Sequence, residues 1–158
     1  MAPLICRIDE ALAGHGVDYA VAGGWAVSLH GAVRGTLDVD LVVPRRRQQY
    51  VAVAGALGSI GLTSGLPIDA GAVFDQLDAL MSAKRLLAWN FVNLDRPNEV
   101  VDILIAEDLA EFTPETRRVG DRDIPVIDRE GLIRMKERAG RRQDLSDVAA
   151  LRRLAQRD

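Results

Sequence analysis

Sulfur and imidazole side chains are scarce in this sequence. Cys6 is its single cysteine, which excludes an intramolecular disulfide. With His15 and His30 as the only histidines, a structural zinc site is not expected either. The sequence lacks the apolar run of about 20 residues that a membrane-spanning helix needs. Its N-terminus also lacks the charged-then-apolar pattern of a signal peptide. We therefore expect a soluble, cytoplasmic protein with no membrane partner.

Apolar residues, in contrast, are plentiful. They form 48% of the 158 residues, which is enough for the hydrophobic core of one domain. We predict a single domain over residues 1–158, with residues 128–158 as a C-terminal helical extension. The net charge of −3 does not indicate a nucleic-acid-binding protein. From Arg134 onward, however, basic residues outnumber acidic ones by eight to four, which fits a solvated helix surface or a contact with phosphates.

The order of helical and extended patterns predicts an α/β (α+β) domain, a mixed β-sheet with flanking helices. Expected strands are 18–22, 37–43, 86–94 and 99–106, followed by a hairpin of 117–119 with 124–127. Expected helices are 3–14, 25–30, 45–59, 129–139 and 145–155, while residues 62–84 are ambiguous apart from a possible helix near Leu77. Residues 95–98 are turn formers between two strands, and Asp144 is the expected N-cap of the last helix.

Two aspartates alternate with apolar residues in the segment Leu37-Asp38-Val39-Asp40-Leu41. Strand periodicity places Asp38 and Asp40 on one face, where like charges repel each other. A cation between them removes that repulsion, and magnesium prefers oxygen ligands. A solvent-facing strand also accommodates such a pair, so the pattern alone does not decide.

A third aspartate lies in an otherwise apolar strand, Val100-Val101-Asp102-Ile103-Leu104-Ile105. Buried aspartates are rare unless they are paired or bound to a metal. If this strand lies beside residues 37–43, the carboxylates of Asp38, Asp40 and Asp102 meet at one place. The alternative for Asp102 is an ion pair with an arginine such as Arg34.

The glycine pair Gly23-Gly24 follows an expected strand and opens an expected helix. Backbone N–H groups at such a position suit a phosphate chain, although a tight turn explains the glycines equally well. Arg34, just before the carboxylates, either meets a phosphate or binds Asp40. His30 has no companion acid or nucleophile in the local sequence, which favours a structural histidine. Asp144 and Asp147 are explained by helix capping.

The segment from Ala22-Gly23-Gly24-Trp25 through Arg34-Gly35-Thr36 to Leu37-Asp38-Val39-Asp40 resembles the signature of the nucleotidyltransferase superfamily, the polymerase-β-like fold. In that family a glycine pair precedes a helix, an Asp-x-Asp follows on the next strand, and a later strand supplies the third carboxylate. The stretch from Leu132 to Asp147 is similar to the tail motif of small bacterial members related to the abortive-infection toxin nucleotidyltransferases. The sequence also resembles the lincosamide and aminoglycoside nucleotidyltransferases.

The resemblance implies transfer of a nucleoside monophosphate from a nucleoside triphosphate to a hydroxyl of a tRNA, a protein or a small molecule, with release of pyrophosphate. By the same resemblance Asp38, Asp40 and Asp102 would hold two Mg²⁺ ions. Gly23 and Gly24 would bind the triphosphate, and Lys136 would reach the phosphates or the acceptor. The toxin likeness implies an antitoxin partner.

In one respect the sequence departs from the family pattern. Many active members carry Gly-Ser where this sequence has Gly23-Gly24 followed by Trp25, so catalytic activity stays an open expectation. A non-catalytic nucleotide-binding or protein-interaction module with the same fold is the main alternative. A metal-dependent hydrolase, which would use similar carboxylates with water as the nucleophile, is the other.

Overall fold

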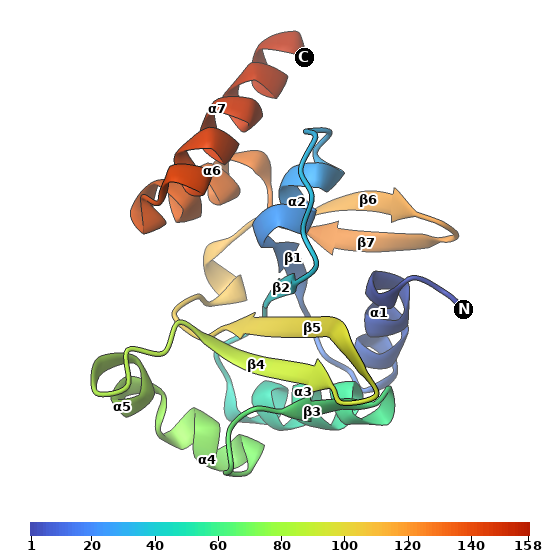
Figure 1. Ribbon diagram of the computed structural model, residues 1–158, viewed down its shortest axis with the longest axis vertical. Helices are drawn as coiled ribbons and strands as arrows, with labels where there is room; N and C mark the ends of the chain where they lie inside the picture. The colour runs from blue at the N-terminus through green and yellow to red at the C-terminus, as the bar shows by residue number, and fades with distance from the viewer.

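All 158 residues are described by the computed structural model, in which one mixed sheet of seven strands is flanked by helices (Figure 1). The strands lie in the order β3-β4-β5-β2-β1-β7-β6. Their bounds are β1 Ala20–Ala22, β2 Val39–Val42, β3 Leu62–Ser64, β4 Ala88–Asn93, β5 Arg96–Leu104, β6 Glu115–Val119 and β7 Arg122–Val126. The helices are α1 Leu4–Gly14, α2 Gly23–Leu29, α3 Arg47–Ser59, α4 Ala70–Asp75, α5 Leu77–Ser82, α6 Arg129–Ala139 and α7 Arg142–Arg157, with a short 3₁₀ turn at Leu109–Glu111. The mixed sheet with flanking helices is therefore confirmed.

Three adjacent strands at the centre of the sheet place the candidate carboxylates. Strand β2 runs antiparallel to β1 and parallel to β5. In that register Asp40 is opposite Asp102 on one side and Ala22 on the other. The predicted adjacency of the two acidic strands is thus confirmed, although each pair of partner residues is 62 positions apart in the sequence.

Buried and exposed side chains alternate along β4 and β5, so one face of the sheet is packed and the other is accessible to solvent. Trp89 and Phe91 of β4 are buried, and Tyr50 of α3 stacks on Trp89 with ring centroids 5.7 Å apart. The intervening residue Asn90 is exposed, and its neighbour Asp102 is only partly buried. Helix α3 therefore covers the side opposite the carboxylates, which leaves them accessible.

Several predicted boundaries were wrong, each for a local reason. The turn between β4 and β5 is tighter than residues 95–98, because β5 already begins at Arg96 and pairs with Asn93. Helix α7 begins at Arg142 rather than Leu145, so its N-cap is Arg141 and not Asp144. Residues 62–84 hold a short strand and two helices that break at Gln76. Asp38 precedes β2 rather than lying within it.

The two C-terminal helices form a pair that packs on α2 through α6, and α7 extends away from the sheet (Figure 1). Helix α6 begins at an N-cap, Asp128, whose side chain accepts from Gly131 N, and it ends at Gly140 in the left-handed conformation. No helix in the structure has both the length and the apolar composition to span a membrane.

Candidate active site

The turn from β1 into α2 brings its first glycine against Asp40. Gly23 has a φ of +65°, a conformation that side chains other than glycine rarely adopt. A Cβ atom at this position would also overlap the Asp40 carboxylate. Only glycine therefore allows the acidic strand to lie this close to the start of α2, which puts backbone N–H groups beside a carboxylate.

The three predicted carboxylates are brought to the same region but are not equivalent. Asp40 and Asp102 are neighbours across β2 and β5, and Asp102 Oδ1 accepts a hydrogen bond from Asn90 Nδ2 at 2.9 Å. Asp38 is exposed at the approach to β2. As their side chains stand, no three His, Cys, Asp or Glu residues enclose a common point at which a metal ion fits.

The carboxylates nevertheless influence one another electrostatically. The pKa of Asp40 is raised to about 6, mainly by burial and then by the nearby charges of Asp102 and Asp38, which outweigh the lowering effect of Lys136 and Arg141. The pKa of Asp102 is also raised, first by burial and then by Asp38, while the hydrogen bond from Asn90 opposes the shift. Grouped carboxylates with raised pKa values are typical of functional sites.

The loop between α2 and β2 folds back over the second glycine. A Cβ on Gly24 would lie 3.0 Å from the Thr36 side chain and 3.3 Å from Arg34 Cζ. Ser28 Oγ of α2 donates a hydrogen bond to Arg34 O at 2.6 Å. The guanidinium of Arg34 is therefore held beside the glycine pair, where the sequence predicted a phosphate-binding group.

Two alternatives from the sequence, in which Arg34 binds Asp40 or forms an ion pair with Asp102, are wrong. Its Nε is 3.1 Å from Asp147 Oδ1 of α7, and Asp102 is instead paired with Asn90. His30 is buried, and its Nε2 lies 2.8 Å from Ile127 O, which agrees with a structural histidine.

A buried cluster of charges joins α6 and α7 behind this loop. Lys136 is 8% exposed, and its Nζ lies 3.3 Å from Asp144 Oδ1 and 2.9 Å from Asp147 Oδ2. Arg141 Nε reaches Asp144 Oδ2 at 2.7 Å. Burial alone would raise the pKa of Asp144 and of Asp147, but hydrogen bonds and the neighbouring cations overcome it and the pKa of each is lowered.

Capping therefore explains these two acids only in part. The Asp144 side chain does accept from Arg141 N, as a residue three positions into a capping box does. Asp147 makes no cap, and both are almost fully buried, at 2% and 3% exposed. The sequence contained a signal for this buried charge cluster, because Asp144 and Asp147 are spaced as neighbours on one helix face within a mainly basic tail.

A cavity of about 200 Å³ opens between Asp40 and α6. Its polar part is lined by Gly23, Asp40, Glu107, Lys136, Arg141 and Asp144. Its apolar part is lined by Leu87, Leu104, Ala106, Leu132, Met135 and Ala139. A cavity lined by cations, carboxylates and aliphatic side chains can take a ligand that carries charged groups on an uncharged body.

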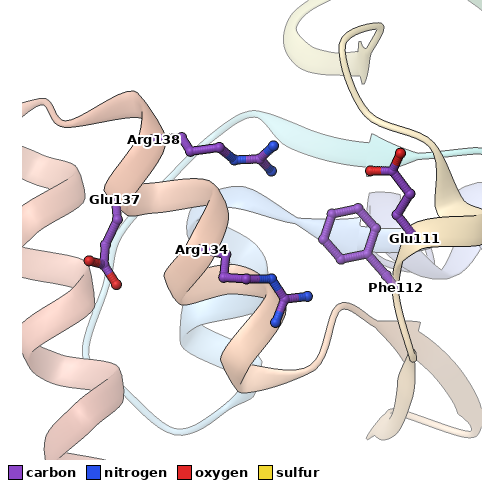
Figure 2. Close-up of a pocket in the computed structure, with 5 residues that line it drawn as sticks. All are labelled: Glu111, Phe112, Arg134, Glu137 and Arg138. Atoms are coloured by element: carbon purple, nitrogen blue, oxygen red, sulfur yellow. The ribbon is translucent and has the colours of Figure 1, made fainter.

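A second, separate cavity lies on another face of α6. Figure 2 shows Arg134 and Arg138 pointing from α6 toward Phe112 and Glu111, whereas Glu137 points toward α7. Arg138 is already held by both oxygens of Glu107 at 3.2 Å, and Glu137 pairs with Arg152. Neither the glycine pair nor any of the three carboxylates lines this cavity, so it is not the predicted site.

The sequence matches no protein-family model and no curated protein. Solved structures share its fold. A solution structure of the antibiotic-resistance factor ANT(2'')-Ia has a TM-score of 0.64 at 15% identity, over 94% of this chain and 80% of that one. The lincomycin-bound lincosamide antibiotic adenylyltransferase LnuA has a TM-score of 0.63 at 17% identity, over 96% of each chain.

An antigenic nucleotidyltransferase-like protein from Paracoccidioides brasiliensis is also similar, with a TM-score of 0.58 at 17% identity, over 94% of this chain and 72% of that one. The chain therefore has the nucleotidyltransferase fold. The expected fold is confirmed, and the likeness concerns the fold alone.

Proposed function

We propose that the protein is a metal-dependent nucleotidyltransferase that moves a nucleoside monophosphate from a nucleoside triphosphate to a hydroxyl acceptor. The observation that carries the proposal is the placement of Asp40, on a nucleotidyltransferase fold, between Asp102 of the next strand and the Gly23 turn. In this arrangement a group of carboxylates adjoins the glycine turn at which α2 begins. Gly23 and Gly24, with Arg34 and Lys136, would bind the triphosphate.

The carboxylates fit divalent metal ions by their chemistry and by their charge. Asp38, Asp40 and Asp102 supply only oxygen ligands, which Mg²⁺ prefers, and neighbouring negative charge contributes, after burial, to the raised pKa values of Asp40 and Asp102. These three residues would hold two Mg²⁺ ions after adjustment of the exposed Asp38 side chain. When bound, the ions would supply positive charge for the phosphates and lower the pKa of an acceptor hydroxyl.

The transfer is an in-line displacement at the α-phosphorus. The acceptor hydroxyl oxygen forms the new P–O bond, and the bond from the α-phosphorus to its bridging oxygen breaks, so that pyrophosphate leaves with that oxygen. The hydroxyl proton passes to the Asp102 carboxylate, which lies beside Asp40 on the neighbouring strand. Lys136, Arg141 and Arg34 lie on the side of the glycine turn, where they stabilise charge on the departing pyrophosphate.

A small molecule is the acceptor class that the comparisons favour. LnuA is a lincosamide antibiotic adenylyltransferase, and one ANT(2'')-Ia structure is a complex with adenylyl-2''-tobramycin. A tRNA or protein acceptor, and control by an antitoxin, depend on the likeness of the tail motif to the toxin-related group. In the basic tail Arg138 and Arg152 are engaged by Glu107 and Glu137, whereas Arg134, Arg142, Arg153 and Arg157 form no ion pair and are the residues that an RNA acceptor would contact.

Label transfer tests the activity directly. The protein is incubated with Mg²⁺ and each α-labelled nucleoside triphosphate, in separate reactions with lincomycin, tobramycin, bulk tRNA and a cell lysate. We expect label on an acceptor and pyrophosphate release, both lost in Asp40→Asn and retained in the surface variant Asp78→Asn. Release of inorganic phosphate without label transfer identifies a hydrolase instead. Nucleotide binding without any turnover identifies a binding module and overturns the enzyme proposal.

A further inference from the structure

The buried charge cluster of α6 and α7 extends to the loop that carries Arg34. We propose that Asp147 is a positioning residue of the nucleotide site, which fixes Arg34 and Lys136 together beside the Gly23-Gly24 turn. This inference rests on the proposed function and deepens it, because it makes α7 a working part of the site rather than an extension that follows it.

The contacts of Asp147 divide between the two cations. Its Oδ1 accepts hydrogen bonds from Arg34 Nε at 3.1 Å and from Gln143 Nε2 at 2.9 Å. Its Oδ2 lies 2.9 Å from Lys136 Nζ. The carboxylate is thus shared between a residue 113 positions earlier in the sequence and one on the preceding helix.

Arg34 carries this connection to the glycine pair. Its guanidinium packs where a Gly24 side chain would be, and its Nη1 donates to Gly35 O at 2.6 Å. Its own carbonyl accepts from Ser28 Oγ of α2. The backbone of Arg34 is therefore fixed by α2 while its guanidinium is fixed by α7, and this ion pair is the one that joins α7 to the loop before β2.

The need to balance the charge of Lys136 does not account for Asp147. Lys136 already has a carboxylate partner, Asp144 at 3.3 Å, so its charge is balanced without a second one. Burial of this further carboxylate costs desolvation, and its contacts with Lys136, Gln143 and Arg34 outweigh that cost. The position of Asp147 between two cations that flank the candidate phosphate site gives that burial a role, because it removes the side-chain freedom that Arg34 and Lys136 would otherwise lose on binding a triphosphate.

Asp147→Asn tests the proposal in the full-length protein without leaving a buried cation unpaired. Lys136 keeps Asp144, and Arg34, at 23% side-chain exposure, gains water. We expect amide hydrogen exchange in residues 31–38 to become faster. We also expect the affinity for whichever of ATP, GTP, CTP or UTP the wild type binds with Mg²⁺ to fall about tenfold, as for loss of a residue that orients a ligand-binding group.

Glu137→Gln is the matched control, since it neutralises an exposed carboxylate of the same helix pair that contacts Arg152 instead. It should change neither measurement. Asp147→Glu should restore part of the lost affinity. In an Arg34→Gln background, Asp147→Asn should weaken binding less than in the wild type, because the two residues act through one contact.

The proposal is overturned if amide hydrogen exchange in residues 31–38 is as slow in Asp147→Asn as in the wild type. It is also overturned if Asp147→Asn and Glu137→Gln bind the nucleotide with equal affinity. Fully additive losses of nucleotide affinity in the Arg34→Gln/Asp147→Asn double variant would overturn it as well. If the wild type binds none of the four triphosphates, the proposed function fails. Hydrogen exchange then still decides whether Asp147 positions Arg34.

Discussion

Asp40 occupies a position that the folded chain accepts at a cost. Burial and two neighbouring carboxylates raise its pKa from 3.8 to about 6, so its charged form is disfavoured in the absence of a cation. Such unfavourable placements are common where a protein binds a charged ligand, because the ligand supplies the missing interaction. The acid is thus better explained as a ligand-binding group than as a contributor to the stability of the sheet.

Asp40→Asn should therefore stabilise the metal-free protein. Because the folded-state pKa lies above the unfolded one, the folded state holds the proton more tightly. Wild-type stability then falls as the pH rises from about 4 to 6 and stays low above it. At pH 7 in EDTA we expect the variant to gain about 1–2 kcal/mol in urea unfolding, a gain that shrinks as the pH approaches 4. If Asp40→Asn is less stable than the wild type at pH 7, the assigned electrostatic cost is contradicted. Asp38→Asn is the control, because Asp38 is exposed and its substitution should increase the free energy of unfolding less.

Gly23 provides a second test of the same contact. Gly23→Ala would place a methyl group in the Asp40 carboxylate and force alanine into a φ of +65°. We expect a loss of about 1–3 kcal/mol in thermal or urea unfolding, and loss of nucleotide binding as the turn shifts. Gly35→Ala is the control, because nothing lies within 4 Å of a Cβ there. Equal effects of the two substitutions would show that Gly23 is not specially constrained.

Helices and strands were predictable where one local pattern sufficed. Helix α6 spans the predicted residues Arg129–Ala139, and the predicted hairpin of 117–119 with 124–127 is present as β6 and β7. Pairing of Asp40 with Asp102 was predicted only as a condition, because no local pattern specifies which strands become neighbours. The motif resemblance made that condition plausible.

The contacts of Arg34 lay beyond local patterns altogether. Its partner, Asp147, is distant in sequence, and Asp147 itself looked like a helix-capping residue. Only the packing of α6 on α2 brings the tail beside the loop before β2. The sequence therefore indicated most of the candidate site residues but missed the charge cluster that holds two of them.

The α6–α7 pair should respond to acid in the opposite sense from Asp40. Asp144 has a lowered pKa, so its stabilising contribution is present above the ordinary aspartate pKa of about 4 and is lost as the pH falls below it. Asp144→Asn should lower the free energy of unfolding by about 1–3 kcal/mol at pH 7 and flatten its decline below pH 4. Asp158→Asn, which removes an exposed partner of Arg129, should leave the acid profile unchanged. An unaltered profile in Asp144→Asn would contradict the assignment.

Charge is arranged unevenly over the molecule as a whole. The net charge is only −3, yet the carboxylates of the candidate site and its supporting cluster outnumber the cations there by five to three, namely Asp38, Asp40, Asp102, Asp144 and Asp147 against Arg34, Lys136 and Arg141. A triphosphate entering this region meets repulsion from the sheet and attraction from the helices. Its binding therefore depends on further positive charge on the side of the sheet.

Removal of divalent metal should consequently abolish tight nucleotide binding. In EDTA we expect the affinity of the wild type for its preferred triphosphate to fall at least about tenfold in calorimetric titrations, and excess Mg²⁺ to restore it. Asp40→Asn/Asp102→Asn relieves the repulsion and removes two ligands. Without metal it should therefore bind the triphosphate more tightly than the wild type does, and Mg²⁺ should improve its affinity little. Equal wild-type affinity with and without Mg²⁺ would show that the helix cations alone hold the phosphates, and that the three aspartates have another role.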